Sequence, residues 1–232
     1  MFRKKLKVFL WGFGFFCFFS FLIISWFSIP WLPHQGLLLL FLSGLFFVVV
    51  ALFWPILDKL SREALNFKYG KEGEETIFNM LCKTLDDNYV YIPNYNIPNA
   101  MIGDIDGLLI GPKGIIILEI KNWAGDFRIS GTDAYKRLRG NIYKLYKKSP
   151  FKQTARQQKY LTKFLKEKGI STKITPIIVL VCGKINSISG KTEIFITEKN
   201  NLINYIFKLT PVPDFLLGTT EKILEALNIP KN

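Results

Sequence analysis

The sequence predicts an α/β fold, with a mixed central sheet flanked by helices and preceded by a two-helix transmembrane hairpin. Three observations predict this. No Lys, Arg, Asp or Glu occurs between Val8 and Leu57. Two aliphatic runs, 104–110 and 115–121, flank a Gly-Pro-Lys-Gly stretch in the way the strands of a β-hairpin flank their turn. Beyond Leu57 the order of patterns is helix, a group of strands, helix, two strands and two helices.

The apolar N-terminal region divides into two segments, 8–29 and 36–57, each of 22 residues. At about 1.5 Å per residue each segment reaches roughly 33 Å, which is enough to cross a bilayer core. The connection 30–35 is short and allows only a hairpin. A cleaved signal peptide is the alternative, but its apolar part spans ~7–15 residues and ends at a small-residue cleavage site, which this sequence lacks.

Basic residues flank the two segments and are absent from the loop between them. They are Arg3, Lys4, Lys5 and Lys7 before the first segment, and Lys59, Arg62, Lys68 and Lys71 after the second. Positive charge accumulates on the cytoplasmic side of membrane proteins. We therefore expect a two-pass membrane protein with both termini and the following domain in the cytoplasm. The expected organisation is a transmembrane hairpin at 1–57, a juxtamembrane helix or linker at 58–68, and a domain at 69–232.

The elements of the domain follow from periodicity and turn residues. The predicted helices are 61–85, weakened midway by Gly70 and Gly73, then 150–168 after an N-cap at Ser149, 201–208 and 220–227. The predicted strands are 89–92, 104–110, 115–121, 127–130, one within 137–146, 174–181 and 193–197.

Composition narrows the function classes. The chain carries 31 Lys and Arg against 18 Asp and Glu, a formal net charge of +13, which favours nucleic acid and anionic lipid equally as partners. The three cysteines include no Cys-x-x-Cys pair, so we expect neither a zinc site nor a disulfide framework. The single histidine, His34, lies in the hairpin loop, which disfavours a histidine base or a Ser-His pair.

The hairpin around Gly-Pro-Lys-Gly carries acids where buried strands normally have none. With a four-residue loop, Ile110 lies opposite Ile115, and counting back places Asp106 opposite Glu119 on one face, with Lys121 on the same face. Opposed like charges are destabilising. A divalent cation between the two carboxylates would remove the repulsion.

Other interpretations of the same residues remain open. Asp104 and Lys121 would form an ordinary cross-strand ion pair in this register. A protonated Asp106 would hydrogen-bond to Glu119. A solvent-exposed strand end would need no compensation at all.

These residues also carry a resemblance to a known family. Gly73-Glu74 in a helix, Asp106 in an Ile-Asp-Gly-Leu-Leu-Ile-Gly-Pro-Lys-Gly hairpin, and Glu119-Ile-Lys-Asn-Trp123 resemble the nuclease-related domain, NERD, over about 69–183. That family is similar to the PD-(D/E)XK nuclease superfamily. The resemblance implies a restriction-endonuclease-like fold, hydrolysis of nucleic acid (DNA before RNA), and Mg²⁺ or Mn²⁺ as the cofactor. Related nucleases often form homodimers, although the sequence shows no interface.

The resemblance implies a role for each matching position. Asp106 and Glu119 would be metal ligands together with the backbone carbonyl of Ile120, and Lys121 would position or activate the attacking water. Glu74 would contribute directly or through a metal-bound water, and Gln153 matches a glutamine in the following helix. One departure is Gly107, where the resemblance leads us to expect His.

The same positions also have simpler interpretations. Glu74 shares the apolar helical stripe of Ile77, but it is also one of three neighbouring acids. Gln153 shares a face with Gln157 and would fit a structural hydrogen bond.

A band of basic residues near the second predicted helix would bind the phosphates of a nucleic acid. The alternative is that this band is only a solvated surface. Its members are Lys136, Arg137, Arg139, Lys144, Lys147, Lys148, Lys152 and Arg156, interleaved with Tyr135, Tyr143 and Tyr146. The sequence therefore predicts a membrane-anchored, metal-dependent nuclease. The alternatives are a non-catalytic module of the same fold that binds nucleic acid or a protein, and a structural membrane protein.

Overall fold

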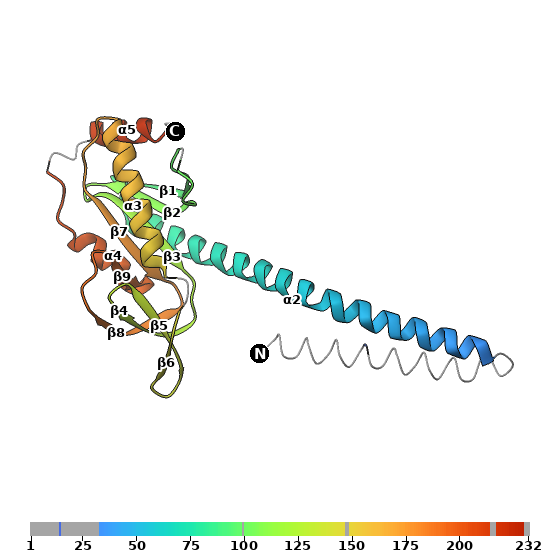
Figure 1. The fold of residues 1–232 in the computed structure, drawn as a ribbon. Coiled ribbons are helices and arrows are strands. Elements are labelled where there is room, and N and C mark those ends of the chain that lie inside the picture. The colour runs from blue at the N-terminus through green and yellow to red at the C-terminus, as the bar shows by residue number, and fades with distance from the viewer. Residues whose placement is uncertain (1–13, 15–32, 99, 147–148, 214–216, 230–232) are drawn as a thin grey trace. The chain divides into compact units, whose positions relative to one another are not determined.

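The structure is a computed structural model that describes residues 14, 33–98, 100–146, 149–213 and 217–229 (Figure 1). The chain divides into two compact units, Met1–Leu65 and Asn66–Asn232. The α/β class is confirmed. The central sheet is mixed, as predicted, but the strands form two sheets instead of one.

The first described element is α2, one continuous helix from Pro33 to Thr84. The second apolar segment, the juxtamembrane segment 58–68 and the predicted helix 61–85 are all helical, as predicted, but they join into a single helix. The predicted loop residue Pro33 is already its first residue, a position that proline favours. Ion pairs one turn apart support the helix through 58–68, such as the Arg62–Asp58 contact of 2.7 Å.

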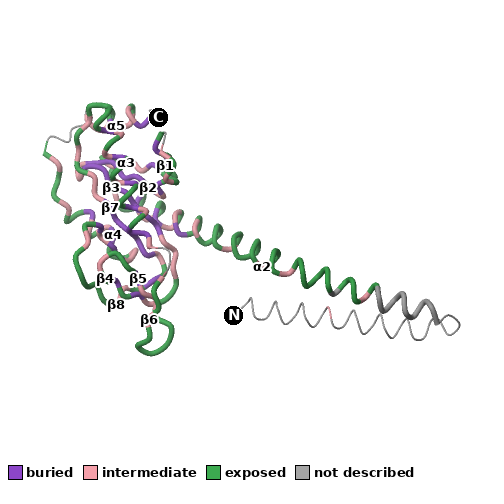
Figure 2. The backbone as a smooth tube through the Cα atoms, in the orientation of Figure 1, coloured by how far each residue is buried: buried purple, intermediate pink, exposed green. Residues whose placement is uncertain are grey.

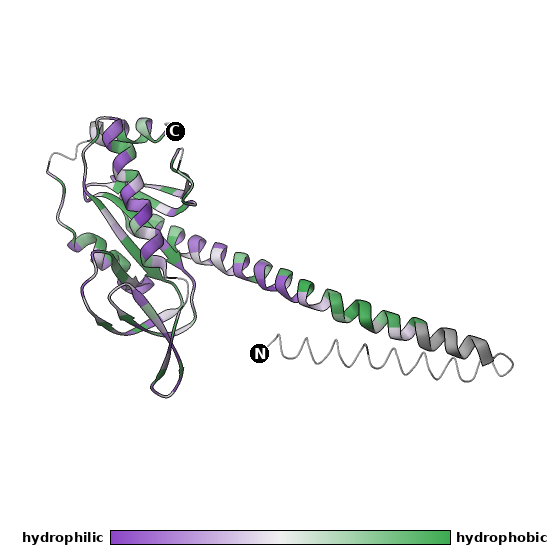
Figure 3. Ribbon diagram, viewed as in Figure 1, coloured by the Kyte–Doolittle hydropathy of each residue, from purple (hydrophilic) through white to green (hydrophobic). Residues whose placement is uncertain are grey.

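One described helix is long and apolar enough to cross a membrane, over Leu42–Thr84, with a hydropathy of 1.7 in its most apolar window. Figure 3 shows the apolar stretch along α2. Leu52 and Phe53 leave 67% and 56% of their surface exposed in this stretch. The described residues thus hold one such helix, not the predicted two-helix hairpin; apart from Gly14, the first predicted span lies outside them.

The central sheet has five strands in the order β1-β2-β3-β7-β9. Their bounds are Val90–Tyr95 for β1, Ile105–Gly111 for β2, Gly114–Lys121 for β3, Ile174–Leu180 for β7 and Phe195–Glu198 for β9. β1, β2 and β3 pair antiparallel, whereas β3, β7 and β9 pair parallel. Burial on both faces explains the nearly continuous aliphatic sequence of β3 and β7.

Helices pack on both faces of this sheet and form a separate apolar core with each face. The strands of the sheet are accordingly buried along much of their length (Figure 2). On one face Leu108 and Ile117 pack with Leu161 of α3, the helix Pro150–Glu167, and with Ile223 of α5, the helix Leu217–Ala226. The other core joins Leu109 and Ile116 to Ile77 of α2 and to α4, the helix Lys199–Lys208. Because strand residues alternate, the two cores use alternate positions of β2 and β3.

The second sheet has the order β6-β5-β4-β8. Its strands are Gly125–Ser130, Asp133–Arg139, Ile142–Leu145 and Gly183–Ser189, for β4, β5, β6 and β8. The predicted single strand within 137–146 is instead a hairpin, because Gly140 with φ 53° makes a turn inside it. β8 was not predicted, since it is mostly exposed and has no aliphatic run.

α3 begins at the predicted Ser149-Pro150, but Ser149 does not cap the helix with its side chain. Its hydroxyl donates instead to the Thr132 carbonyl at 2.7 Å, in the turn between β4 and β5. The start of α3 is thereby tied to the second sheet, while its later turns lie on the first.

Candidate active site

The β2–β3 hairpin has the predicted register. Ile110 pairs with Ile115 and Leu108 with Ile117, and the ladder closes at Gly111 and Gly114. The paired residues end at Gly107 and Leu118, one step before the two acids. Asp106 and Glu119 therefore lie side by side at the end of the ladder, on the face that α3 covers.

Beyond the last main-chain pair of β2 and β3, the side chain of Asp106 makes the next hydrogen bond between the two strands. Its Oδ2 accepts a hydrogen bond of 2.7 Å from the Ile120 N–H. Asp104, by contrast, is exposed, and among the described residues it makes no ion pair with Lys121. The alternative of an Asp104–Lys121 pair is therefore wrong.

Lys121 contacts both acids. Its Nζ lies 3.5 Å from Asp106 Oδ2 and forms a close ion pair with Glu119 Oε1. The Glu119 side chain is fully buried, whereas Asp106 and Lys121 each keep about a fifth of their side-chain surface exposed, 17% and 23%. We call these three residues together with Glu74 the acid–lysine cluster.

Burial and mutual charge shift the protonation of this cluster. Burial, and then the charge of Asp106, raise the pKa of Glu119 to about 7, although the Lys121 ammonium opposes the rise. Burial acts to lower the pKa of Lys121, but the two carboxylates outweigh it and raise that pKa above its ordinary value. Lys121 is thus a charged hydrogen-bond donor in the metal-free protein.

Glu74 reaches the cluster from α2, as its place on the apolar stripe predicts. It is half-buried, and burial followed by the charge of Asp106 raises its pKa, while the Asn94 side chain and the charge of Lys121 oppose this. Asn94 has a left-handed backbone with φ 49°, which Asn tolerates better than most residues. Sequence reasoning missed Asn94, because its contact depends on the fold of β1.

Gly73 explains how α2 comes so close to the end of β3. A Cβ at Gly73 would lie 2.9 Å from the Cβ of Asn122, so the position has no room for a side chain. The Asn122 amide donates to the Tyr69 carbonyl at 2.8 Å and fastens the helix there. Gly73 therefore allows α2 to approach the residue that follows β3, whereas it was predicted only to weaken the helix.

We expect Gly73→Ala to destabilise the domain and to displace Glu74, although alanine is the better helix former. Gly70→Ala is the matched control, since no atom lies within 4 Å of a Cβ there, and it should stabilise by about 0.5–1 kcal/mol. Thermal unfolding of both variants measures this. Stabilisation by Gly73→Ala would contradict the close approach.

Two glutamines of α3 lie against Glu119. Gln153, the predicted residue, donates from Nε2 to Glu119 Oε2 at 3.1 Å. Gln157 is fully buried and donates to the Asp104 carbonyl at 2.8 Å, which holds the chain just before Asp106. The sequence placed Gln157 only on the same helix face as Gln153, and a second glutamine on that face was the signal that could have identified it.

The donor atoms of the cluster fit a hard divalent cation. Glu119 Oε1 is buried and, apart from its ion pair with Lys121, has no hydrogen-bond partner in the described part of the chain. No group of three His, Cys, Asp or Glu side chains that could hold a metal occurs among the described residues. Carboxylate oxygens such as those of Asp106 and Glu119 suit Mg²⁺, which keeps several of its waters when bound.

Trp123, at the end of the predicted motif, is a packing residue. Its ring lies 5.2 Å from the Phe127 ring and 4.4 Å from the Tyr146 ring, measured between centroids. These contacts join the end of β3 to the second sheet.

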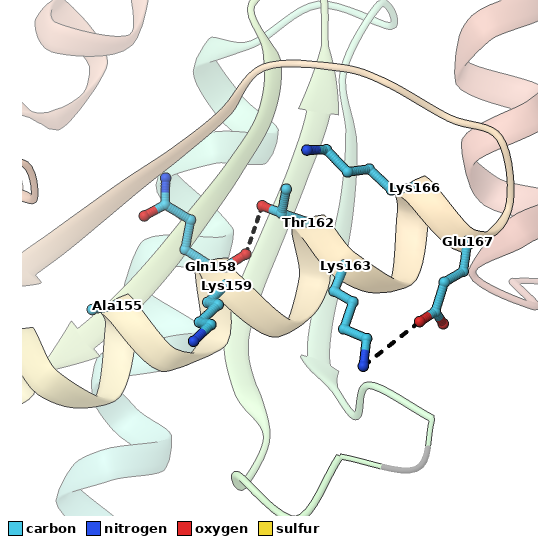
Figure 4. Close-up of a pocket in the computed structure, with 7 residues that line it drawn as sticks. All are labelled: Ala155, Gln158, Lys159, Thr162, Lys163, Lys166 and Glu167. Carbon is cyan, nitrogen blue, oxygen red and sulfur yellow. Dashed lines mark hydrogen bonds and ion pairs between the residues drawn. The ribbon is translucent and has the colours of Figure 1, made fainter.

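A separate hollow of about 560 Å³ runs along one flank of α3 (Figure 4). Its lining residues are Ala155, Gln158, Lys159, Thr162, Lys163, Lys166 and Glu167. None belongs to the acid–lysine cluster, and one of the three lysines, Lys163, pairs with Glu167 at 3.8 Å. The hollow adds positive charge to α3 without adding reactive groups.

The fold and the site define a class: an α/β domain that brings two carboxylates and a lysine together at the end of a β-hairpin. Residues 69–181 match the nuclease-related domain family, NERD, and the chain carries a domain of that family. The match contains every residue of the acid–lysine cluster and both glutamines. No curated protein and no solved structure matches this chain.

Proposed function

We propose that this protein is a membrane-anchored nuclease that uses Mg²⁺ or Mn²⁺ to hydrolyse phosphodiester bonds of nucleic acid, with DNA as the preferred substrate. One observation carries the proposal: the Lys121 ammonium contacts the carboxylates of both Asp106 and Glu119, in a domain of a nuclease-related family. Such a group combines oxygen ligands for a cation with a donor for the reacting phosphate.

The ligands of the cation would be the carboxylates of Asp106 and Glu119 and the carbonyl of Ile120, with Glu74 acting through a water. When bound, the cation supplies Lewis-acid polarisation of the phosphate and lowers the pKa of a coordinated water. The hydrogen bond from Ile120 N–H to Asp106 holds the main chain of Ile120 beside that carboxylate.

Lys121 would hold the attacking water and stabilise the negative charge that develops on the phosphate. Its raised pKa favours the donor role over that of a base. Gln153 would orient the Glu119 carboxylate through its hydrogen bond, and Gln157 would keep the segment before Asp106 in place.

The phosphates of the substrate would lie along the basic band. Arg139, Lys144, Lys152 and Arg156 are exposed there, whereas Arg137 is already paired with Asp126 at 3.1 Å. Lys147 and Lys148 lie outside the described residues. Lys152 and Arg156 flank Gln153 on the first turns of α3, next to the cluster.

We expect the double variant Lys152→Gln/Arg156→Gln to bind DNA more weakly and with a shallower salt dependence, because each lost phosphate contact reduces the slope of log K against log salt by about 1. Fluorescence anisotropy at several salt concentrations measures both quantities. Lys222→Gln on α5 is the control, since α5 lies at the other end of the domain from β5 and β6 (Figure 1). Equal slopes in the double variant and the wild type would remove these residues from the interface.

Lipid would cover the apolar stretch of α2, and the domain would face the cytoplasm. The support is the exposure of Leu52 and Phe53 together with the basic residues that follow at Lys59 and Arg62. Extraction of membranes with carbonate tests the anchor, because an integral protein stays in the pellet.

The activity is tested with the full chain in detergent, incubated with linear DNA, circular DNA and RNA at varied Mg²⁺ and Mn²⁺. We expect DNA cleavage that disappears with EDTA. Binding without cleavage in every metal would instead favour a non-catalytic module. A protein that shows no binding and no cleavage would overturn the proposal.

A further inference from the structure

Tyr91 lies flat across Gly107, the residue that follows Asp106. A Cβ at Gly107 would stand 2.5 Å from the Tyr91 hydroxyl oxygen and 2.7 Å from Cε2. Position 107 therefore has no room for a side chain, and the phenol of a neighbouring strand fills that space. This accounts for glycine at a position where the family resemblance predicts His.

The strand register puts this phenol on the face of the sheet that α2 covers, the face from which Glu74 reaches the acid–lysine cluster. Tyr91 pairs with Leu109, and Gly107 is two residues before Leu109 on the same face. The ring thus extends along β2 as far as Gly107, at the end of the ladder, where the charges of Glu74 and Asp106 act on its hydroxyl. The Phe78 ring of α2 contacts it, with centroids 5.5 Å apart.

The hydroxyl keeps its proton beside the acids. Burial, then the charges of Glu74 and Asp106, raise the pKa of Tyr91 well above its ordinary value. Among the described residues no hydrogen bond uses this hydroxyl, so its proton is available to another molecule.

We propose that the Tyr91 hydroxyl donates a hydrogen bond to a phosphate oxygen of the nucleic acid bound at the acid–lysine cluster; this inference rests on the proposed function. The three acids of the cluster repel a phosphate, and Lys121 is shared between two of them. A neutral donor at their edge offsets that repulsion locally. Tyrosine hydroxyls are among the groups that commonly contact phosphates in nucleic-acid complexes.

The test is Tyr91→Phe in the full chain, with Tyr89→Phe as the matched control. Tyr89 covers Gly111 in the same way, 2.4 Å from a Cβ there, but at the turn end of β2, away from the acids. Affinity for a short duplex is measured with Ca²⁺ in place of Mg²⁺, and single-turnover cleavage is measured with Mg²⁺.

We expect Tyr91→Phe to lower affinity or cleavage roughly 10-fold to 100-fold, as for a lost hydrogen bond to a charged group, and Tyr89→Phe to change neither. The salt slope of binding should stay the same, because a neutral donor releases no counterion. Wild-type behaviour of Tyr91→Phe in both assays overturns the inference and leaves the proposed function standing. Equal losses in the two variants also overturn it, because the hydroxyls then serve packing alone. A wild-type protein that neither binds nor cleaves overturns the proposed function itself.

Discussion

Lys121→Met should abolish cleavage, reducing the single-turnover rate by about 10²–10³-fold or more, the usual cost of losing a donor that stabilises transition-state charge. The variant keeps the length of the side chain but removes the ammonium that contacts Asp106 and Glu119. Binding of DNA should persist, since the basic band is unchanged. Cleavage within threefold of the wild type would remove Lys121 from the mechanism.

The matched control is Lys113→Met, in the turn of the same hairpin. Lys113 Nζ donates to the carbonyls of Leu209 at 2.6 Å and Phe207 at 3.2 Å, at the C-terminal end of α4. Its loss should lower stability by about 1–3 kcal/mol while cleavage survives. If Lys121→Met fails to fold, Lys121→Arg keeps the charge and should still cleave poorly, because a planar guanidinium cannot replace the compact ammonium.

The metal-free protein should lose stability as pH rises from about 4.5 to 7. The folded pKa of Glu119, about 7, lies above its ordinary value of 4.5. An acid whose pKa is raised by folding stabilises the fold fully below the unfolded pKa, and that contribution disappears as pH rises through the folded pKa. At 1.36 kcal/mol per unit the loss is on the order of 3 kcal/mol.

Mg²⁺ should reverse this loss at pH 8, because the deprotonated carboxylates then bind it and ligand binding stabilises the folded state. Thermal unfolding in EDTA and in Mg²⁺ across this pH range measures both effects. The stability of Glu119→Gln should not fall between about pH 4.5 and 7, and Mg²⁺ should not raise it at pH 8. Glu198→Gln, which neutralises a carboxylate that accepts from the Ile185 N–H far along the chain, should keep the Mg²⁺ response. A full response in Glu119→Gln would contradict metal binding at this residue.

The acids could be placed from the sequence because the hairpin is local. A four-residue turn sets the register of β2 and β3, and the two-residue periodicity of strands then brings Asp106 and Glu119 to one face. Helical periodicity likewise placed Glu74 beside Ile77 and Gln153 beside Gln157.

The parts that the sequence did not predict depend on contacts between distant segments. Tyr91 reaches Gly107 only through the β1–β2 register, and no tight turn sets that register because β1 ends at Tyr95 and β2 begins at Ile105. The role of Gly73 depends on Asn122, which follows β3. Propensity alone predicted that Gly73 weakens the helix, and tertiary contact outweighs that propensity.

The parallel pairing of β3 with β7 has a consequence for biosynthesis. Ile115 through Lys121 acquire their second hydrogen-bonded neighbour from Ile174 through Leu180, and the Val181 N–H then donates to the Lys121 carbonyl. Contacts so distant in sequence form late and slowly. A nascent chain on the ribosome can close the local β2–β3 hairpin early, but β3 lacks its second neighbour until residue 181 has emerged, so the acid–lysine cluster acquires its buried setting only after most of the domain has been translated.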